Sequence, residues 1–142
     1  MTNLIHATGK LIVSPITRLN SKKRPNDNWA IVPVDVGLAE FYREMLIQNQ
    51  LHPKWLRERR KVHGTFWKPH ITVLDGRVQL DEKQKKILSG YNGVAIKYQY
   101  DISPYQHWKF WALKVYSQDL DNIRKNIGLK PYQLHITIAR EE

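Results

Sequence analysis

The chain has 142 residues, of which 42% are hydrophobic and 11% aromatic, a composition typical of a folded globular domain and not of a disordered chain. It contains no cysteine, which excludes a disulfide framework, a thiolate metal site and a cysteine nucleophile. Twenty-three Lys and Arg residues against thirteen Asp and Glu give a formal net charge of +10, which attracts polyanions such as nucleic acid, although excess lysine can also serve solubility alone.

The sequence has no basic N-terminal segment followed by a long apolar one, and no run of about 18 apolar residues occurs in it. We therefore expect a soluble, cytoplasmic protein that does not contact a membrane. The length fits a single domain, residues 1–142, or two small lobes of one domain.

The first part of the chain predicts two strands and a helix. Residues 9–16 are rich in β-branched side chains and indicate a strand, whereas residues 19–28 are polar and indicate a loop. Residues 29–34 predict a second strand, at an edge or a bulge because Pro33 cannot donate to a ladder. From residue 38 to 50, apolar residues recur at the spacing of an amphipathic helix. Its predicted apolar face consists of Leu38, Phe41, Tyr42, Met45 and Leu46.

The most basic window follows that helix, at residues 54–61. It could hold a phosphate backbone while Trp55 stacks on a base, but we favour a solvated helix with one buried tryptophan. The cluster at residues 22–24 is likewise expected in a solvated loop.

The remainder of the chain predicts four strands and two helices. The strands are 66–74, 93–101, 107–116 and 133–139, and the helices are 81–88 and 118–127. Gly90 and Gly128 are placed to end the two helices. Residues 102–106 are short enough for a hairpin loop between the second and third of these strands.

The order strand, helix, His-x-Thr strand occurs twice. The first copy begins at Trp29 and ends in Pro-His-Ile-Thr-Val-Leu at residues 69–74. The second begins at Trp111 and ends in Leu-His-Ile-Thr-Ile-Ala at residues 134–139. This repetition suggests a pseudo-twofold α+β arrangement in which each lobe contributes one motif strand to a shared central cleft, although generic β-α-β patterning could also produce it.

The two motifs offer an acid-base pair. Side chains alternate along a strand, so His70 and Thr72 share one face, as do His135 and Thr137. Near neutral pH one imidazole can accept a proton while the other donates one, and the hydroxyls can bind phosphate oxygens. A single His-x-Thr is more often structural, but two in matching repeats favour catalysis. The remaining histidines are expected to be structural or on the surface: His6, His52, His63 and His107.

A metal site is less attractive, because each motif supplies one ligand and no carboxylate cluster lies beside either. We therefore expect catalysis without a cofactor.

With these motifs, in this order, the chain resembles the two-histidine (2H) phosphoesterase superfamily between residues 29 and 140. The resemblance implies a bilobal, pseudo-twofold α+β (LigT-like) fold with antiparallel sheets lining a cleft, and no metal. It implies His70, Thr72, His135 and Thr137 as catalytic residues. Implied substrates are 2′,3′-cyclic phosphates, 2′-5′ linked RNA or cyclic oligonucleotides.

Small members of that superfamily include RNA repair phosphodiesterases and phage anti-CBASS enzymes, which degrade cyclic nucleotide immune signals. The compact size and short basic loops are closer to the phage type, for which the location would be the host cytoplasm. The sequence ends soon after the second motif, so we expect no C-terminal segment to cover a bound nucleotide.

Four further residues are candidates for binding substrate. Trp29, Trp108 and Trp111 could stack on bases, although core packing is expected for at least one. Trp108 and Trp111 are three apart on a predicted strand and should face opposite sides. Arg140 could reach a phosphate or be an exposed strand-end arginine.

The expected activity is cleavage of a phosphodiester in a cyclic or short oligonucleotide. One alternative is an RNA end-processing enzyme that acts on a 2′,3′-cyclic phosphate, so RNA is a further candidate partner. Another is a non-catalytic nucleic-acid-binding module. No obligate protein partner is inferred.

Overall fold

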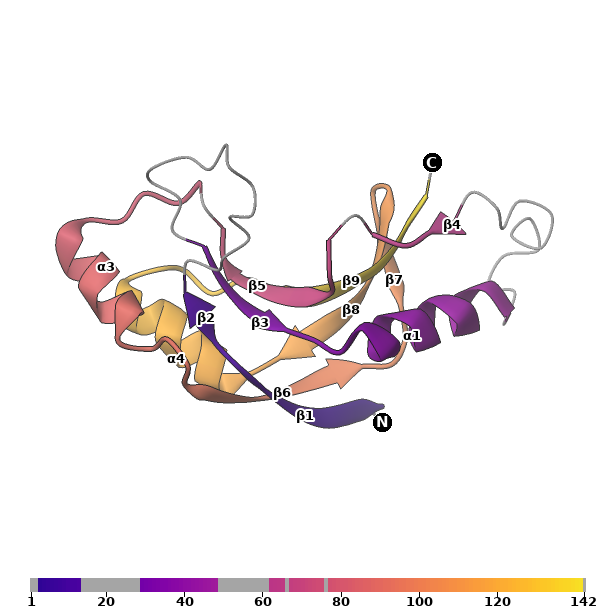
Figure 1. Cartoon of the computed structure of the whole chain (residues 1–142), viewed down its shortest axis with the longest axis horizontal. Helices are drawn as coiled ribbons and strands as arrows, with labels where there is room; N and C mark the ends of the chain where they lie inside the picture. Colours follow the sequence, from indigo (N-terminus) through magenta and orange to yellow (C-terminus); the bar gives the residue numbers. More distant parts are fainter. Residues whose placement is uncertain (1–2, 14–28, 49–61, 66, 76, 142) are drawn as a thin grey trace.

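The computed structural model describes residues 3–13, 29–48, 62–65, 67–75 and 77–141, and within them the chain is α+β (Figure 1). The strands are β1 Leu4–Lys10, β2 Ile12–Val13, β3 Ala30–Pro33, β4 Val62–His63, β5 His70–Leu74, β6 Ala95–Asp101, β7 Tyr105–His107, β8 Phe110–Tyr116 and β9 Leu134–Glu141. The helices are α1 Val36–Gln48, α3 Glu82–Ser89 and α4 Gln118–Ile127. The basic segments 22–24 and 54–61 lie outside the described residues.

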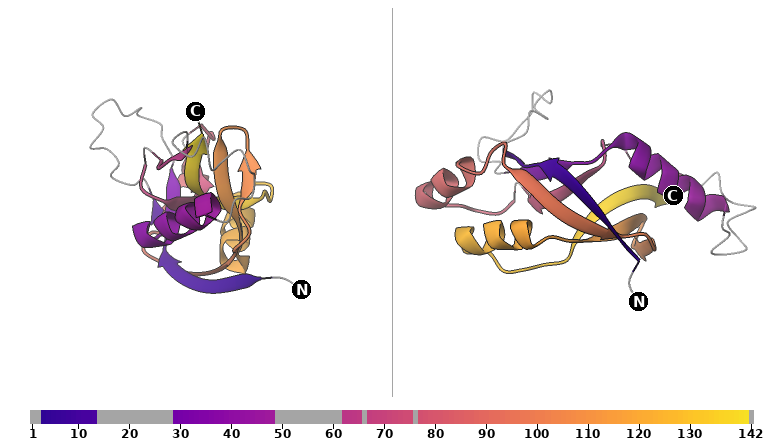
Figure 2. Two further views of the ribbon diagram at one scale, coloured as in Figure 1. Left: turned by 90° about the vertical axis from the view of Figure 1, so that its right-hand side faces the viewer. Right: turned by 90° about the horizontal axis from the view of Figure 1, so that it is seen from below.

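All the strands join one antiparallel sheet in the order β1-β6-β8-β9-β5-β3-β2, and β4 and β7 pair with β9 and β8. The sheet curls, so that β1 and β6 cross one face of its other half (Figure 2). At this crossing a Cβ on Gly9 would lie 2.6 Å from Cγ1 of Val32, which is too close for any side chain. The curl therefore needs glycine at position 9.

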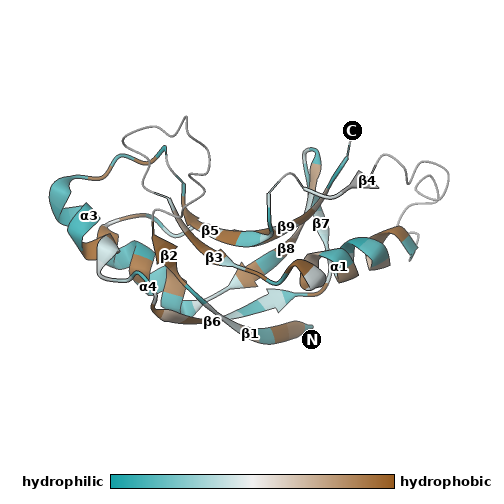
Figure 3. Ribbon diagram, viewed as in Figure 1, coloured by the Kyte–Doolittle hydropathy of each residue, from teal (hydrophilic) through white to brown (hydrophobic). Residues whose placement is uncertain are grey.

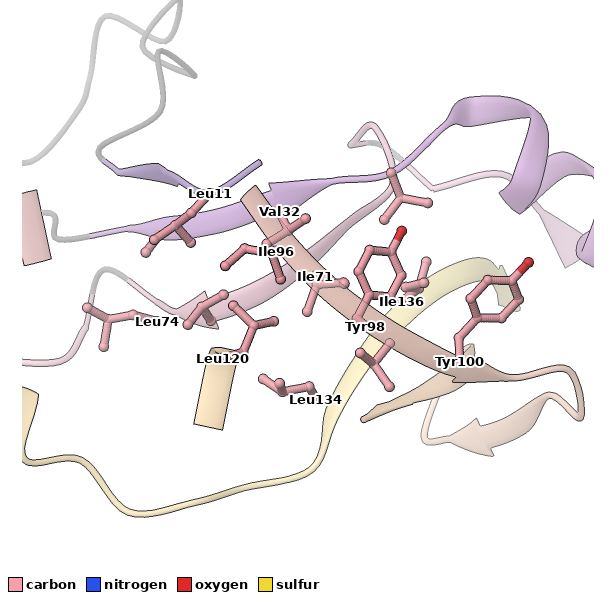
Figure 4. Packing of buried hydrophobic residues seen from close by; sticks show 14 of the residues in the cluster. Leu11, Val32, Ile71, Leu74, Ile96, Tyr98, Tyr100, Leu120, Leu134 and Ile136 are labelled. Carbon is pink, nitrogen blue, oxygen red and sulfur yellow. The ribbon is translucent and has the colours of Figure 1, made fainter. Parts of the chain in front are cut away.

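The core lies inside the curl, between strands β1 and β6 on one side and strands β3, β5 and β9 on the other (Figure 4). Ile71 of β5 and Ile136 of β9 meet Ile96 and Tyr98 of β6 there, and α4 adds Leu120. Polar and apolar residues follow one another along β5, as expected for a strand with one face in a core (Figure 3).

Helix α4 confirms the predicted range and the predicted cap. Ser117 begins the helix by accepting a hydrogen bond from the backbone N–H of Leu120, and Gly128 ends it in a left-handed conformation with φ 89°. The buried residues Ile123 and Ile127 pack its apolar face into the core.

Helix α1 has the expected range within two residues, and its predicted apolar face was right for Leu38, Tyr42 and Leu46 but wrong for Phe41 and Met45. Phe41 and Met45 are 57% and 38% exposed, and the buried side consists of Ala39, Tyr42 and Leu46. Apolar residues occupy much of this helix, so spacing alone could not choose the side. The helix packs against β9 on the side of Ala39, whose small side chain allows close approach.

Two predicted strands were also wrong in extent. The first strand begins at Leu4, and Leu11 interrupts it because its backbone N–H and carbonyl bond to Val94 and Gly93 instead. The predicted strand 107–116 starts only at Phe110, as β8; the end of the predicted loop 102–106 instead forms β7 together with His107, and Trp108 lies in the turn between the two strands at φ 56°. Because Trp108 is outside a strand, its direction does not follow from alternation with Trp111.

No helix in the described ranges has the length and apolar character needed to cross a membrane.

Candidate active site

The two His-x-Thr motifs lie side by side on β5 and β9. These strands are antiparallel, with Ile71 opposite Ile136. Continuing this register by one residue each way places His70 opposite Thr137, and Thr72 opposite His135. Directly opposed residues point to the same face with Cβ atoms about 4.5–5.5 Å apart. Each motif's histidine therefore stands beside the other motif's threonine.

The motif histidines and threonines lie on the side of the sheet opposite the core, as their exposure shows. Ile71 and Ile136 are both 0% exposed, whereas the motif histidines and threonines are all partly exposed. We call the partly exposed side of β5 and β9, with the side chains of neighbouring strands that point the same way, the site face.

The two histidine rings are fixed in matching ways. The Nδ1–H of His70 donates to the backbone carbonyl of Lys68, at 2.8 Å, and His135 bonds to the backbone of Gln133. In each case the partner lies two residues before the histidine. Because a carbonyl only accepts, Nδ1 of His70 carries a proton, which makes Nε2 the acceptor nitrogen of the neutral ring.

The pKa of His135 lies below its ordinary value. Burial is the largest cause, and the positive charges of His107 and His70 lower it further, while the hydrogen bond with Gln133 opposes these effects. The His135 ring is therefore mainly neutral near pH 7 and able to accept a proton.

His107 thus lies within electrostatic reach of His135, although sequence reasoning left it structural or on the surface. It is exposed at the end of β7, in the hairpin that β7 forms with β8. The only sequence feature that could have suggested a role for His107 was its position next to Trp108. The turn at Trp108, which sets the direction of the hairpin, could not be predicted from strand alternation.

Strand β8 adds a cation beside the motifs. Lys114 lies opposite His135, so its side chain leaves the same face of the sheet. It is exposed, and its Nζ lies 5.4 Å from the centre of the Tyr105 ring.

A bulge turns Arg140 toward the site face. Along β9, Thr137 is opposite Ala112 and Ala139 is opposite Trp111, so Ile138 is an extra residue. Without this insertion, alternation would send Arg140 to the core side; with it, the residue shares the face of Thr137. Its Nε donates to the carbonyl of Gly64 at 3.1 Å, which steadies the side chain.

The three tryptophan candidates occupy different surroundings. Trp29 is half-buried immediately before β3, next to β5 in the sheet. Trp108 is 73% exposed in the β7–β8 turn. Trp111 packs against the core, and its Nε1–H donates to the Glu141 carboxylate at 3.0 Å. The indole of Trp111 is therefore on the side away from the motif histidines.

Two side chains that bond to the backbone of β5, Tyr132 and Arg124, were not found from the sequence. The Tyr132 hydroxyl donates to the backbone carbonyl of Thr72, and the Arg124 guanidinium stacks on the Tyr132 ring at 4.2 Å. Arg124 also donates to the carbonyl of Val73 at 2.7 Å. These contacts hold the motif strand at its threonine.

The described residues contain no group of three or more His, Cys, Asp or Glu side chains that could hold a metal ion. What the arrangement offers instead is two imidazoles, two hydroxyls and two cations on one face, a combination that suits an anionic group undergoing proton transfer.

A family model described as Swiss Army Knife, 2H phosphoesterase domain, matches residues 30–142. The match includes both motif strands and the β7–β8 hairpin. Searches of curated proteins and of solved structures found no match.

Proposed function

The chain belongs to the 2H phosphoesterase family, and on this basis we propose that it is a metal-independent phosphodiesterase acting on cyclic or short oligonucleotides. The observation that carries the proposal is the register of β5 and β9, which sets His70 beside Thr137 and His135 beside Thr72. A phosphate placed over Ile71 and Ile136 would have an imidazole on each side and a hydroxyl next to each imidazole.

In the proposed reaction the neutral His135 is the general base. Its ring takes a proton from the attacking water or ribose hydroxyl, and the oxygen so activated forms a bond to phosphorus. The bond from phosphorus to the leaving oxygen breaks, and His70 in its protonated form gives that oxygen a proton. The lowered pKa of His135 supports this division, because a base must be unprotonated when substrate binds.

The threonines and Arg140 bind the scissile phosphate in this proposal, and Lys114 lies beside them. Charge grows on the non-bridging oxygens during attack, and the hydroxyls of Thr72 and Thr137 can donate to them. Arg140, turned to the same face by the bulge, and Lys114, opposite His135, supply positive charge nearby.

We also propose that the two halves of the sheet are the two lobes of one domain. Strands β3 and β5 are joined by a segment that includes α1, and strands β8 and β9 by α4, so each half has the same order of elements. The β5–β9 pair is where the halves meet. This arrangement supports an active site shared by the two motif strands.

Degradation of cyclic nucleotide immune signals in a cytoplasm is the biological role that we propose for this activity, and processing of a 2′,3′-cyclic RNA end is the second candidate. Net charge +10 supports both equally, because both substrates are anionic.

Product analysis tests the proposal. The protein is incubated in EDTA with cyclic dinucleotides, cyclic trinucleotides, a 2′,3′-cyclic nucleotide and a short RNA, and products are separated by chromatography. We expect turnover of the cyclic oligonucleotides; turnover of the 2′,3′-cyclic end alone would favour RNA processing. No turnover of any substrate would overturn the proposal, and salt-sensitive binding in that case would favour the nucleic-acid-binding module.

A further inference from the structure

The β7–β8 hairpin combines aromatic and basic side chains without an acidic one. Residues 105–114, which we call the hairpin arm, read Tyr-Gln-His-Trp-Lys-Phe-Trp-Ala-Leu-Lys and contain no Asp or Glu. The arm stands beside the C-terminal part of β9 (Figure 1), to which β8 is paired along its length. Aromatic rings interleaved with cations form the surface on which single-stranded nucleic acid binds.

Two cation–aromatic pairs lie along the arm. The Nζ of Lys114 lies 5.4 Å from the centre of the Tyr105 ring, near the motif strands. The Nζ of Lys109 lies 4.9 Å from the Trp108 ring at the tip. Each pair can offer a ring to a base and an ammonium to a phosphate, and the two pairs lie at opposite ends of the arm.

Trp108 is displayed in an unusual way. It is 73% exposed, and it is the only non-glycine residue with positive φ in the described part of the chain. A bulky residue in this conformation costs free energy that Gly or Asn would largely avoid. The ring makes an edge contact with Phe110, with centroids 6.1 Å apart, and this contact orients it. Binding of a ligand such as a nucleotide base would explain why an indole is exposed and oriented at a strained position.

The arm is fastened to β9 on its other face. Gln106 and Trp111 both donate to the Glu141 carboxylate, at 2.7 and 3.0 Å, and the Glu141 backbone N–H bonds to the carbonyl of Lys109 at 2.7 Å. The Glu141 carboxylate is therefore engaged in hydrogen bonds on that face of the arm. An arm held in this way needs little ordering when a ligand binds.

The arm begins at the candidate active site. Lys114 lies opposite His135 in the sheet, and the charge of His107 is one of the causes of the lowered pKa of His135. A nucleic acid whose phosphate is at the motif histidines would thus have the arm as its neighbouring surface.

We infer that the hairpin arm is a nucleotide subsite, in which Trp108 stacks on a base and Lys114 contacts a phosphate next to the scissile one. This inference rests on the proposed function and narrows it. The preferred substrates are oligonucleotides with at least one nucleotide beyond the scissile bond, and a 2′,3′-cyclic mononucleotide is a poor substrate.

Kinetics on matched substrates tests the inference. The pair is a 2′,3′-cyclic mononucleotide and a dinucleotide that ends in the same cyclic phosphate. We expect kcat/KM to be at least about tenfold higher for the dinucleotide, because one stacked base contributes on that scale. Trp108→Ala and Lys114→Gln should each remove most of this preference, whereas Trp108→Phe should keep much of it.

Two matched controls lie away from the arm. Phe41→Ala removes an exposed aromatic ring from α1, and Lys97→Ala removes an exposed lysine from β6. Both should leave the preference unchanged. Equal kcat/KM values for the two substrates in the parent protein, or an equal loss for both substrates in Trp108→Ala, would overturn the inference.

A binding measurement separates this inference from the proposed function. Fluorescence anisotropy with a labelled DNA tetranucleotide, which has no 2′-hydroxyl to attack its own phosphates, reports binding to the arm, and chromatography of the probe afterwards checks that it is intact. We expect Trp108→Ala to weaken binding about tenfold, with circular dichroism spectra matching the parent. Weaker binding by this variant would support a nucleotide subsite on the arm even if no substrate were turned over. Unchanged binding would overturn the inference even if turnover were found.

Discussion

Ile71 and Ile136 lie opposite each other on β5 and β9, and both are completely buried. This pair fixes the position of both motifs at once, because a shift of either strand by one residue would turn its histidine into the core. Core packing and site geometry are therefore set by the same two side chains.

The first prediction concerns this pair. Ile71→Ala should lower the free energy of unfolding by about 2–5 kcal/mol, because it removes buried contacts and leaves a cavity, and Ile71→Val by about 0.5–1.5 kcal/mol. Chemical denaturation followed by circular dichroism measures both. Ile12→Val, on the partly exposed β2, is the control and should cost less than Ile71→Val. Equal losses at the two positions would contradict the central place of Ile71.

The second prediction follows from the lowered pKa of His135. The folded protein holds the ring neutral to a lower pH than the unfolded chain does, so the unfolded state binds more protons just below the ordinary value of 6.5. Stability from this source is present above that pH and is lost as pH falls through the folded pKa. We expect Tm to fall more between about pH 7 and about pH 5 in the parent than in His135→Gln. Parallel curves of Tm against pH for the parent and His135→Gln would contradict this prediction.

The third prediction concerns His107. Its positive charge lowers the pKa of His135, so His107→Gln should move the acidic limb of the kcat/KM profile to higher pH if His135 is the base. The direction follows from removal of a like charge, which makes protonation of His135 easier. A pH–rate profile on any substrate that the protein cleaves measures it. An acidic limb that moved to lower pH would contradict the assignment.

Much of the fold followed from the sequence, and the exceptions have identifiable causes. Helix α4 was predicted to the residue because the apolar spacing and Gly128 agree, and the structure adds Ser117 as its N-cap. The face of α1 was predicted only in part, because apolar residues surround too much of the helix for spacing alone to show that Ala39 is buried while Phe41 and Met45 are exposed.

The candidate site likewise has features that the sequence predicted and features that it did not. Alternation placed each histidine and its threonine on one face, and burial agrees. Three other features depend on pairing between strands that are distant in the sequence, which local sequence does not encode. They are the register that brings the two motifs together, the bulge at Ile138 that turns Arg140, and the turn at Trp108 that directs the hairpin arm.

The fourth prediction tests the strained turn. Trp108→Gly should keep the parent Tm or raise it, with a gain in unfolding free energy of up to about 1 kcal/mol, because glycine adopts positive φ without a Cβ clash. The same variant should bind the labelled tetranucleotide about tenfold more weakly. Scanning calorimetry and anisotropy on one preparation give both values. A lower Tm with unchanged binding would mean that the indole serves stability.

The fifth prediction concerns the two motif histidines as one acid-base pair. His70→Ala and His135→Ala should each lower kcat by about 10²–10⁴-fold, and the double variant should lose little more than the worse single one, because the two groups act in one step. His6→Ala is the control, since His6 is exposed on β1 and bonds to Gln99. Each variant should keep the parent circular dichroism spectrum.

The measurement that tests the two-histidine mechanism most directly is therefore kcat in EDTA for the parent, the two single variants and the double variant, on whichever substrate the parent cleaves. We predict two large single losses that do not add. A His135→Ala protein with the parent's kcat would contradict catalysis by the His70–His135 pair.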